Sequence, residues 1–242
     1  MAHGRVGEGS PAMPQGVGPA IDEAAPRPAT VSAEEVARLA TRLRSELDAA
    51  GLDAIDPPRA EWLAVHVHRG QTDRLGVAYI DHPRAVAELA DGLVERLPPP
   101  QRTMRLREQV HVAALLHDTL EDTPLTTADL AVARVPDPVI RAIEALTKRD
   151  GEAYADAVRR AALDPLARLV KAADLMHNTE PERTRQLREH DDGEAAARLA
   201  ARYTPARAFL LEVIALHGIN SVTSDDLRAI EEELEQGVGA LG

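Results

Sequence analysis

The residues best suited to chemistry in this chain are histidines and carboxylates set between apolar stretches. His117 and Asp118 follow the apolar run Ala114-Leu115-Leu116, and Glu121 and Asp122 lie shortly after them. On a continuous helix, residues four apart share a face, which pairs His117 with Glu121 and likewise pairs the two aspartates. Burying ionisable groups at the end of an apolar helix is costly unless a cation compensates their charge. The pattern therefore predicts a cation site.

Two residues from other parts of the chain extend this set to four ligands. His82 lies upstream and Asp174 downstream, and each falls in a segment with helical periodicity. Two imidazoles and two carboxylates without thiolate suit manganese, iron or another first-row divalent ion, with zinc as an open alternative. Such an ion lowers the pKa of its bound water and neutralises phosphoryl oxygens. The expected metal ligands are His82, His117, Asp118 and Asp174. Glu121 and Asp122 remain to position or deprotonate the attacking water.

Four further residues are candidates for substrate contacts. Asn178 shares a helical face with Asp174 by the four-residue spacing. Lys148 and Lys171 are the only lysines and could neutralise a phosphate, although Lys171 could equally pair with Asp174 on the same helix. Arg69 either contacts the substrate or interacts favourably with the end of its own helix.

The elements that must position these residues are helices. Ser32 and Glu35 form a capping-box signature for a helix to about residue 50, and Asp56 followed by two prolines opens the next. No stretch alternates as a strand would. We expect an all-α domain of about ten helices, with Pro205 breaking or kinking one of them. The other expected helices span 83–97, 105–121, 126–134, 138–148, 152–162, 165–179, 193–217 and 224–236.

Composition narrows the classes of function. The chain has 242 residues, no cysteine and a formal net charge of −12, which argues against a nucleic-acid partner and excludes disulfides and thiolate metal sites. No apolar run reaches the length of a membrane span and no signal peptide is evident, so a cytoplasmic protein is expected. Only five residues are aromatic. A nucleobase would therefore rest on arginine and aliphatic surface, with Tyr79 or Tyr154 as the exceptions.

The chain divides into three expected regions. Residues 1–30 are rich in glycine and proline, which predicts a disordered tail. Residues 31–190 hold every candidate site residue and form the expected catalytic domain. Residues 191–242 are expected to add helices packed on the same domain, either closing the site or forming a homodimer face.

Five separated segments resemble, in order, the HD-domain metal phosphohydrolases. More narrowly, they resemble the (p)ppGpp hydrolase domain of the RelA/SpoT-type alarmone enzymes and its small stand-alone relatives. The segments are His68-Arg69-Gly70-Gln71, Tyr79-Ile80-Asp81-His82-Pro83, His117-Asp118-x-x-Glu121-Asp122-Thr123, Leu146-Thr147-Lys148 and Ala173-Asp174-Leu175-Met176-His177-Asn178. The resemblance covers about residues 60–185. It implies an all-α HD-domain fold with additional C-terminal helices.

The resemblance also implies roles for individual residues. The implied ion is Mn²⁺, with Fe²⁺, Zn²⁺, Co²⁺ and Mg²⁺ as alternatives. The implied roles are metal ligation by His82, His117, Asp118 and Asp174, water activation by Glu121 and Asp122, a nucleotide contact by the basic side chain of Arg69, and a sugar or phosphate contact by Asn178. After Asn178 the alarmone hydrolases usually continue with an apolar residue, arginine and threonine, whereas this chain has Thr179-Glu180-Pro181. This difference bears on the substrate rather than on the metal.

Three functions are compatible with these observations. The first is a metal-dependent phosphohydrolase of a small nucleotide, acting on a (p)ppGpp-type substrate as a 3′-pyrophosphohydrolase. The second is a nucleotide phosphatase that releases orthophosphate from a nucleoside monophosphate or related nucleotide. The third, of another class, is a catalytically inactive nucleotide sensor. An intact ligand set and acidic pair favour the two enzymes.

Overall fold

The computed structural model describes residues 30–190 and 193–239, so all but the last residue of the expected disordered tail lies outside the described residues. This part of the chain is all-α, as predicted, and its only β-type pairing is an isolated bridge between Thr72 and Ala78. None of its helices is long and apolar enough to cross a membrane. The helices are α1 Ala33–Ala50, α2 Pro57–Val67, α3 Asp81–Arg96, η1 Pro99–Gln101, α4 Met104–Leu116, α5 Thr119–Asp122, α6 Thr127–Val132, α7 Asp137–Leu146, α8 Tyr154–Leu163, α9 Pro165–Asn178, α10 Pro181–His190, α11 Gly193–His217 and α12 Ser224–Gly239.

Side-chain caps fix where several helices begin. The Ser32 hydroxyl accepts a hydrogen bond from the backbone N–H of Glu35, so α1 begins where the sequence predicts. Asp56 caps α2 by accepting from the N–H of Arg59, with a proline in the first turn. Asp164 caps α9 in the same way, accepting from two backbone N–H groups. Each cap satisfies donors that the first turn of a helix leaves without partners.

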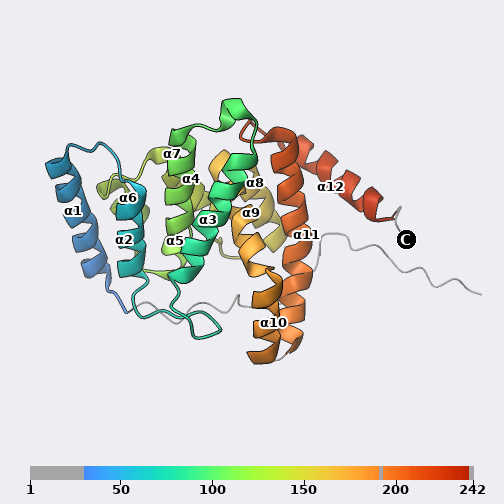
Figure 1. Cartoon of the computed structure of the whole chain (residues 1–242), viewed down its shortest axis with the longest axis horizontal. Coiled ribbons are helices and arrows are strands. Elements are labelled where there is room, and N and C mark those ends of the chain that lie inside the picture. Colours follow the sequence, from blue (N-terminus) through green and yellow to red (C-terminus); the bar gives the residue numbers. More distant parts are fainter. Residues whose placement is uncertain (1–29, 191–192, 240–242) are drawn as a thin grey trace, which may run out of the picture.

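The centre of the molecule is formed by α3, α4 and α9, which contact one another (Figure 1). On the far side of α4 lies α2, while α7 packs against both α4 and α9. Their facing leucine, valine and alanine side chains form one continuous buried core. Because the three central helices or their ends carry His82, His117 and Asp174, packing of this core brings the residues predicted to bind metal toward one another.

The expected helix over 105–121 is two helices in the structure, so the prediction of a continuous helix was wrong. Between α4 and α5 stand His117 and Asp118. The His117 imidazole bonds the Ala114 carbonyl at 2.8 Å, and the Thr119 hydroxyl donates to the Leu116 carbonyl at 2.7 Å. Side chains thus take up carbonyls that a continuous helix would use. The break sets His117 and Asp118 side by side at the end of the apolar helix.

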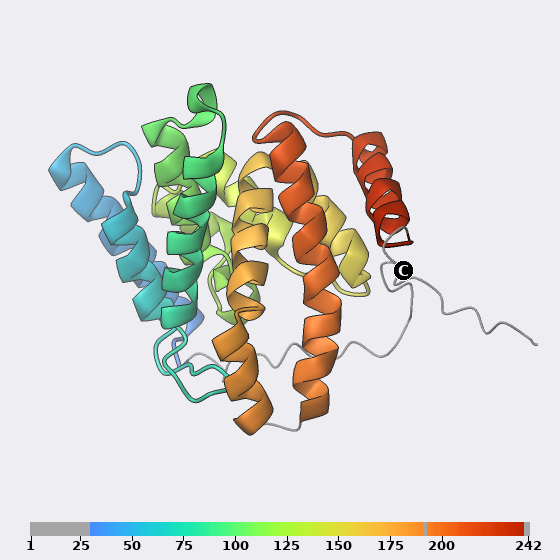
Figure 2. The ribbon, with the colours of Figure 1, turned by 45° about the vertical axis from the view of Figure 1, so that its right-hand side comes forward.

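The C-terminal part of the chain differs from expectation in two ways. The helix α10 was not predicted, and α11 continues through Pro205 without a break. Both pack against α9, and they also contact each other (Figure 2). The turn that follows the C-terminal end of α11 contains Gly218 and Asn220. Their carbonyls accept hydrogen bonds from Arg168, a fully buried residue of α9. This arginine ties the turn after α11 to the central bundle.

Candidate metal centre

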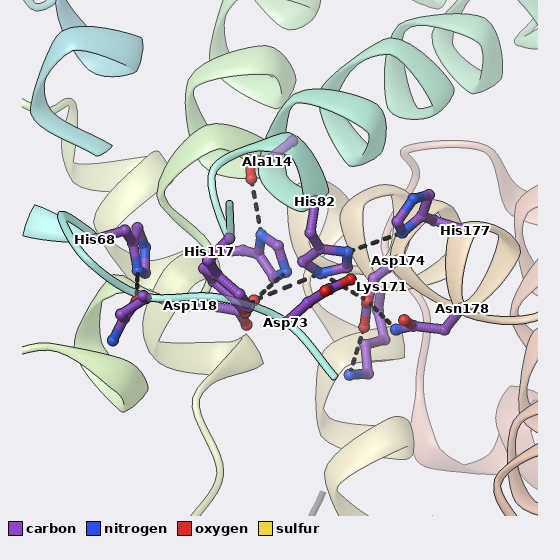
Figure 3. Close-up of polar contacts among 12 residues, drawn as sticks. His68, Asp73, His82, Ala114, His117, Asp118, Lys171, Asp174, His177 and Asn178 are labelled. Carbon is purple, nitrogen blue, oxygen red and sulfur yellow. Dashed lines mark hydrogen bonds and ion pairs between the residues drawn. The ribbon is translucent and has the colours of Figure 1, made fainter. Parts of the chain in front are cut away.

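Three side chains converge between the ends of α3 and α4 (Figure 3). One ligand atom from each of His82, His117 and Asp118 lies within 4.8 Å of the others. The Asp118 Oδ2 atom is 2.8 Å from His117 Nε2 and 3.6 Å from His82 Nε2. Both histidines are buried, and Asp118 is half-buried. Two nitrogens and a carboxylate oxygen therefore face a common point.

The hydrogen bonding of His117 indicates that this point suits a cation. Because His117 Nδ1 donates to the Ala114 carbonyl, neutral His117 presents a lone pair at Nε2 toward the carboxylate of Asp118. This Nε2 atom is buried, and the described residues offer it no hydrogen-bond partner. Without a metal, the mismatch is relieved by a proton: burial opposes it, but Asp118 outweighs burial and raises the His117 pKa to about 9. A divalent cation between the two atoms satisfies both.

His82 is oriented by a second histidine. Its Nδ1 atom lies 2.8 Å from Nδ1 of His177, so one ring donates and the other accepts. Burial, with the nearby charges of His82 and Arg183, lowers the His177 pKa to about 4, and His177 is therefore neutral. When His82 donates from Nδ1, its Nε2 lone pair is free to face Asp118, which is the tautomer that metal ligation requires.

Asp174 lies beside the cluster, and hydrogen bonds hold it in place. Its Oδ1 atom is 3.5 Å from His82 Nε2 and accepts a hydrogen bond from Asn178 at 2.6 Å. Its Oδ2 atom accepts from Lys171 Nζ at 2.9 Å. The structure thus brings together all four predicted ligands, although only His82, His117 and Asp118 meet within 4.8 Å. Asn178 contacts Asp174, as its spacing suggests.

The acidic pair lies on α5 and is anchored from two directions. Glu121 accepts a hydrogen bond from the backbone N–H of Lys148 at 3.0 Å, and the Asp122 carbonyl accepts from Gln71 at 2.8 Å. Burial, reinforced by the charges of Asp118 and Glu121, raises the Asp122 pKa to about 7. A carboxyl group with this pKa exchanges a proton near neutrality, which is what a general acid or base requires.

Tyr79 connects the loop before α3 to the cluster. Its hydroxyl donates a hydrogen bond to Asp118 Oδ2. Burial, together with the charge of Asp118, raises the Tyr79 pKa well above its ordinary value, so the hydroxyl stays protonated and remains a donor. Tyr79 thereby fixes the orientation of the carboxylate that the two histidines face.

A cavity of about 270 Å³ opens over the cluster and contains both acidic and basic side chains. Its basic lining residues are Arg74, Lys148, Lys171 and Arg183. Arg69 is not among the lining residues: it pairs with Glu35 of α1 at 3.0 Å and is more than half exposed. The arginines at the cavity are instead Arg74 and Arg183, which the sequence analysis did not single out.

The remaining cavity wall comes from the helices after α9. Its residues are Thr184 and Leu187 of α10 and Ala196, Leu199, Ala200 and Tyr203 of α11. Arg183 of α10 pairs at 2.9 Å with Asp73, which lies in the loop that leads to α3. Tyr203 is the aromatic residue of this part of the wall. Tyr154 is not among the lining residues but packs against Tyr203, with the two ring centroids 6.0 Å apart.

Comparison with known proteins finds a family that resembles the central segment of the chain. Residues 79–179 match the HD domain family. The chain is 36% identical over 131 residues to the bifunctional (p)ppGpp synthase/hydrolase SpoT of Escherichia coli K12, an alignment that covers 50% of this chain and 17% of that protein. It is 37% identical over 129 residues to a GTP pyrophosphokinase of Streptomyces coelicolor, covering 50% and 14%.

A third relative is named for hydrolysis alone. The guanosine-3′,5′-bis(diphosphate) 3′-pyrophosphohydrolase of Haemophilus influenzae is 32% identical over 126 residues, covering 48% of this chain and 17% of that protein. The chain therefore spans about one sixth of the length of the curated relatives it matches.

Proposed function

Because residues 79–179 match the HD domain family, we propose that this chain is a divalent-metal-dependent phosphohydrolase of a small nucleotide. We propose further that the nucleotide is of the (p)ppGpp type and that pyrophosphate leaves from its 3′ position. One observation carries the first proposal: the lone pairs of His82, His117 and Asp118 meet at the floor of a cavity that also holds an acidic pair and four basic side chains.

The residues present fit a divalent cation. The unpartnered Nε2 atom of His117 and the carboxylate of Asp118 would hold it, together with His82 and with Asp174 alongside. Nitrogen and oxygen donors without sulfur are the set that Mn²⁺ and similar ions accept, and we assign Mn²⁺ as the ion. When bound, such an ion activates water and neutralises phosphoryl charge.

The chain's own groups handle the proton and the substrate. In hydrolysis the water oxygen forms a bond to phosphorus, the ester or anhydride oxygen leaves, and the proton released by the water needs an acceptor. Asp122, with a pKa near 7, takes this proton at its carboxylate. Glu121 is held by the Lys148 backbone and positions the water. The side chains of Lys148 and Arg74 lie where they can bind the phosphates.

Two observations bear on which phosphate product is released. Two of the relatives are named as enzymes that hydrolyse (p)ppGpp-type nucleotides, which supports pyrophosphate release. The cavity volume of about 270 Å³ is slightly below the ~300–1,000 Å³ typical of ligand pockets. A small cavity favours the second candidate, a nucleotide phosphatase that acts on a nucleoside monophosphate and releases orthophosphate.

The test is a product assay with the purified, Mn²⁺-loaded chain. A (p)ppGpp-type nucleotide and nucleoside monophosphates are supplied separately, and pyrophosphate and orthophosphate are measured. Glu121→Gln and Asp122→Asn should each retain the metal and lower turnover by ~10²–10⁴-fold. Glu95→Gln, an exposed change outside the cavity, is the matched control and should leave turnover unchanged. If the metal-loaded protein releases neither product from any nucleotide but binds one, it is a sensor rather than an enzyme.

A further inference from the structure

We infer that α10 and α11 supply the surface that holds the nucleobase of the substrate, which extends the proposed function to the selection of the substrate. We call this surface the apolar wall. It consists of Leu187 of α10 and of Ala196, Leu199, Ala200 and Tyr203 of α11, all of which line the cavity above the metal cluster.

The apolar wall is one continuous face of a helix. Its four residues on α11 recur at spacings of three and four, so they project from the same side. At the two ends of this face, Ala196 and Tyr203 are buried, while Leu199 and Ala200 in the middle are half-buried. Where α10 and α11 run side by side (Figure 2), Leu187 adds to the same wall. The middle of the wall is therefore the part open to a ligand.

The side of the cavity opposite the apolar wall is polar and charged. It is built from the loop before α3, the start of α3, the junction of α4 and α5, α5 itself and α9, and most of its side chains are carboxylates, imidazoles and bases. Among them is His117, 4% exposed, whose Nε2 atom has no hydrogen-bond partner within the described ranges. This atom belongs to the proposed metal site, which therefore lies at the polar end of the cavity. A ligand that fills the cavity therefore has a charged end and an apolar end.

The shape of the wall favours a flat apolar group. The wall carries small alanines at 196 and 200, and the buried Tyr203, whose ring packs against Tyr154, lies at one end of it. Flat rings stack favourably on tyrosine and on aliphatic surface. With phosphates at the metal end, the group at the apolar end is the base of a nucleotide.

The position of the wall in the sequence suggests why it selects the substrate. All five wall residues lie beyond residue 179, where the match to the HD domain family ends. The metal ligands lie inside the matched segment, so the shared chemistry and the apolar wall come from different stretches of the chain. The wall is thus the part of the cavity in which this chain can differ from other members of the family.

Binding measurements test the inference without relying on turnover. Mn²⁺-loaded protein is titrated with GDP, with ADP and with inorganic pyrophosphate, which has the phosphates but no base. Ala200→Leu fills the space over the middle of the wall and should weaken binding of the better nucleotide about tenfold or more, while pyrophosphate binding changes less than twofold. Ala201→Leu, an exposed neighbour on the same helix, is the matched control and should change neither.

A second variant covers the case in which Ala200→Leu does not fold. Leu199→Ala enlarges the cavity instead of filling it and should weaken nucleotide binding severalfold, again sparing pyrophosphate. Equal weakening of nucleotide and pyrophosphate, no change in either, or no nucleotide binding by the unaltered protein would overturn the inference. Base-dependent binding that responds to Ala200→Leu without any hydrolysis would uphold the apolar wall and reject the proposed enzyme.

Discussion

Two sets of polar groups are buried in this helical bundle, and they are satisfied in opposite ways. Arg168 of α9 is fully buried and donates to the carbonyls of Gly218 and Asn220 at 3.0 and 3.1 Å. At the cluster, by contrast, neutral His117 and Asp118 turn one acceptor toward another at 2.8 Å. Arg168 thus donates to carbonyls in the first region, whereas in the second the Nε2 lone pair of neutral His117 faces Asp118, whose Oδ2 atom also accepts from the Tyr79 hydroxyl.

The difference shows how a buried polar residue can be judged. Arg168 donates from Nη1 to two carbonyls and so holds the turn after α11 in place, although its buried Nε atom has no hydrogen-bond partner among the described residues. At the cluster, His117 and Asp118 gain a positive charge between them from a proton or from a cation. Both regions are buried. A buried group that donates to acceptors of the chain is a structural contact, whereas two buried acceptors that face each other indicate a site for a proton or a cation.

The largest effect is expected from Asp118→Asn, which removes the negative charge at the centre of the cluster. We expect metal binding to be lost and turnover to fall by at least ~10³-fold, because the amide cannot offset the charge of a divalent cation. Metal analysis of the purified protein and a product assay check this. In the presence of chelator and above the His117 pKa of about 9, where His117 is neutral, thermal unfolding should change little. A large loss of stability there would show that the cluster serves the fold.

An intermediate effect is expected from Arg168→Met, which removes the donor from the carbonyl of the buried Gly218. The free energy of unfolding should fall by ~1–3 kcal/mol, the cost of one unsatisfied buried acceptor. Denaturant unfolding measures this, with Arg198→Met on the exposed side of α11 as the control. Metal content should stay at the level of the unaltered protein. Loss of metal in a folded Arg168→Met protein would contradict the separation of the two regions.

The smallest effect is expected from His177→Ala, which deletes the acceptor that orients His82. Metal affinity should fall by ~10–100-fold, as is common when a group that orients a metal-bound histidine is lost. Titration of metal-free protein with Mn²⁺ checks this, and His111→Ala, which removes a histidine paired with Asp91 on the surface, is the control. His177→Gln retains an acceptor and should recover part of the affinity. Unchanged affinity in His177→Ala would show that His82 needs no such partner.

Much of the fold could be predicted because its signals are local. The first helix begins directly after Ser32, and the capping box of α6 is formed by Thr126 and Asp129 as their spacing predicts. The break at His117 was missed because it arises from side chains competing for helix carbonyls, which periodicity does not reveal. The signals for α10 were also local: Pro181 in the first turn followed by Glu182, a common helix start, but they were interpreted only as a departure from the family.

The candidate site was predictable where residue types are rare and less so where they are common. Histidines and paired carboxylates in an apolar context stand out, and the structure brings the four expected ligands together. Arginines are numerous, and nothing local distinguishes Arg69, which pairs with Glu35, from Arg74 and Arg183, which reach the cavity. Tyr203 escaped notice for a similar reason: its position depends on how α11 packs against α9 and α10.

Because α11 lies against α9 but contributes none of the four expected metal ligands, its inner face is free to vary while the ligands stay fixed. A substitution at Ala196 or Ala200 reshapes the cavity without displacing His82 or Asp174. The shape of the cavity and the proposed metal site can therefore be altered separately by substitution. Exchange of the segment beyond residue 180 between relatives would transfer the preference for a nucleobase. The expected metal ligands, which precede this segment, would stay unchanged.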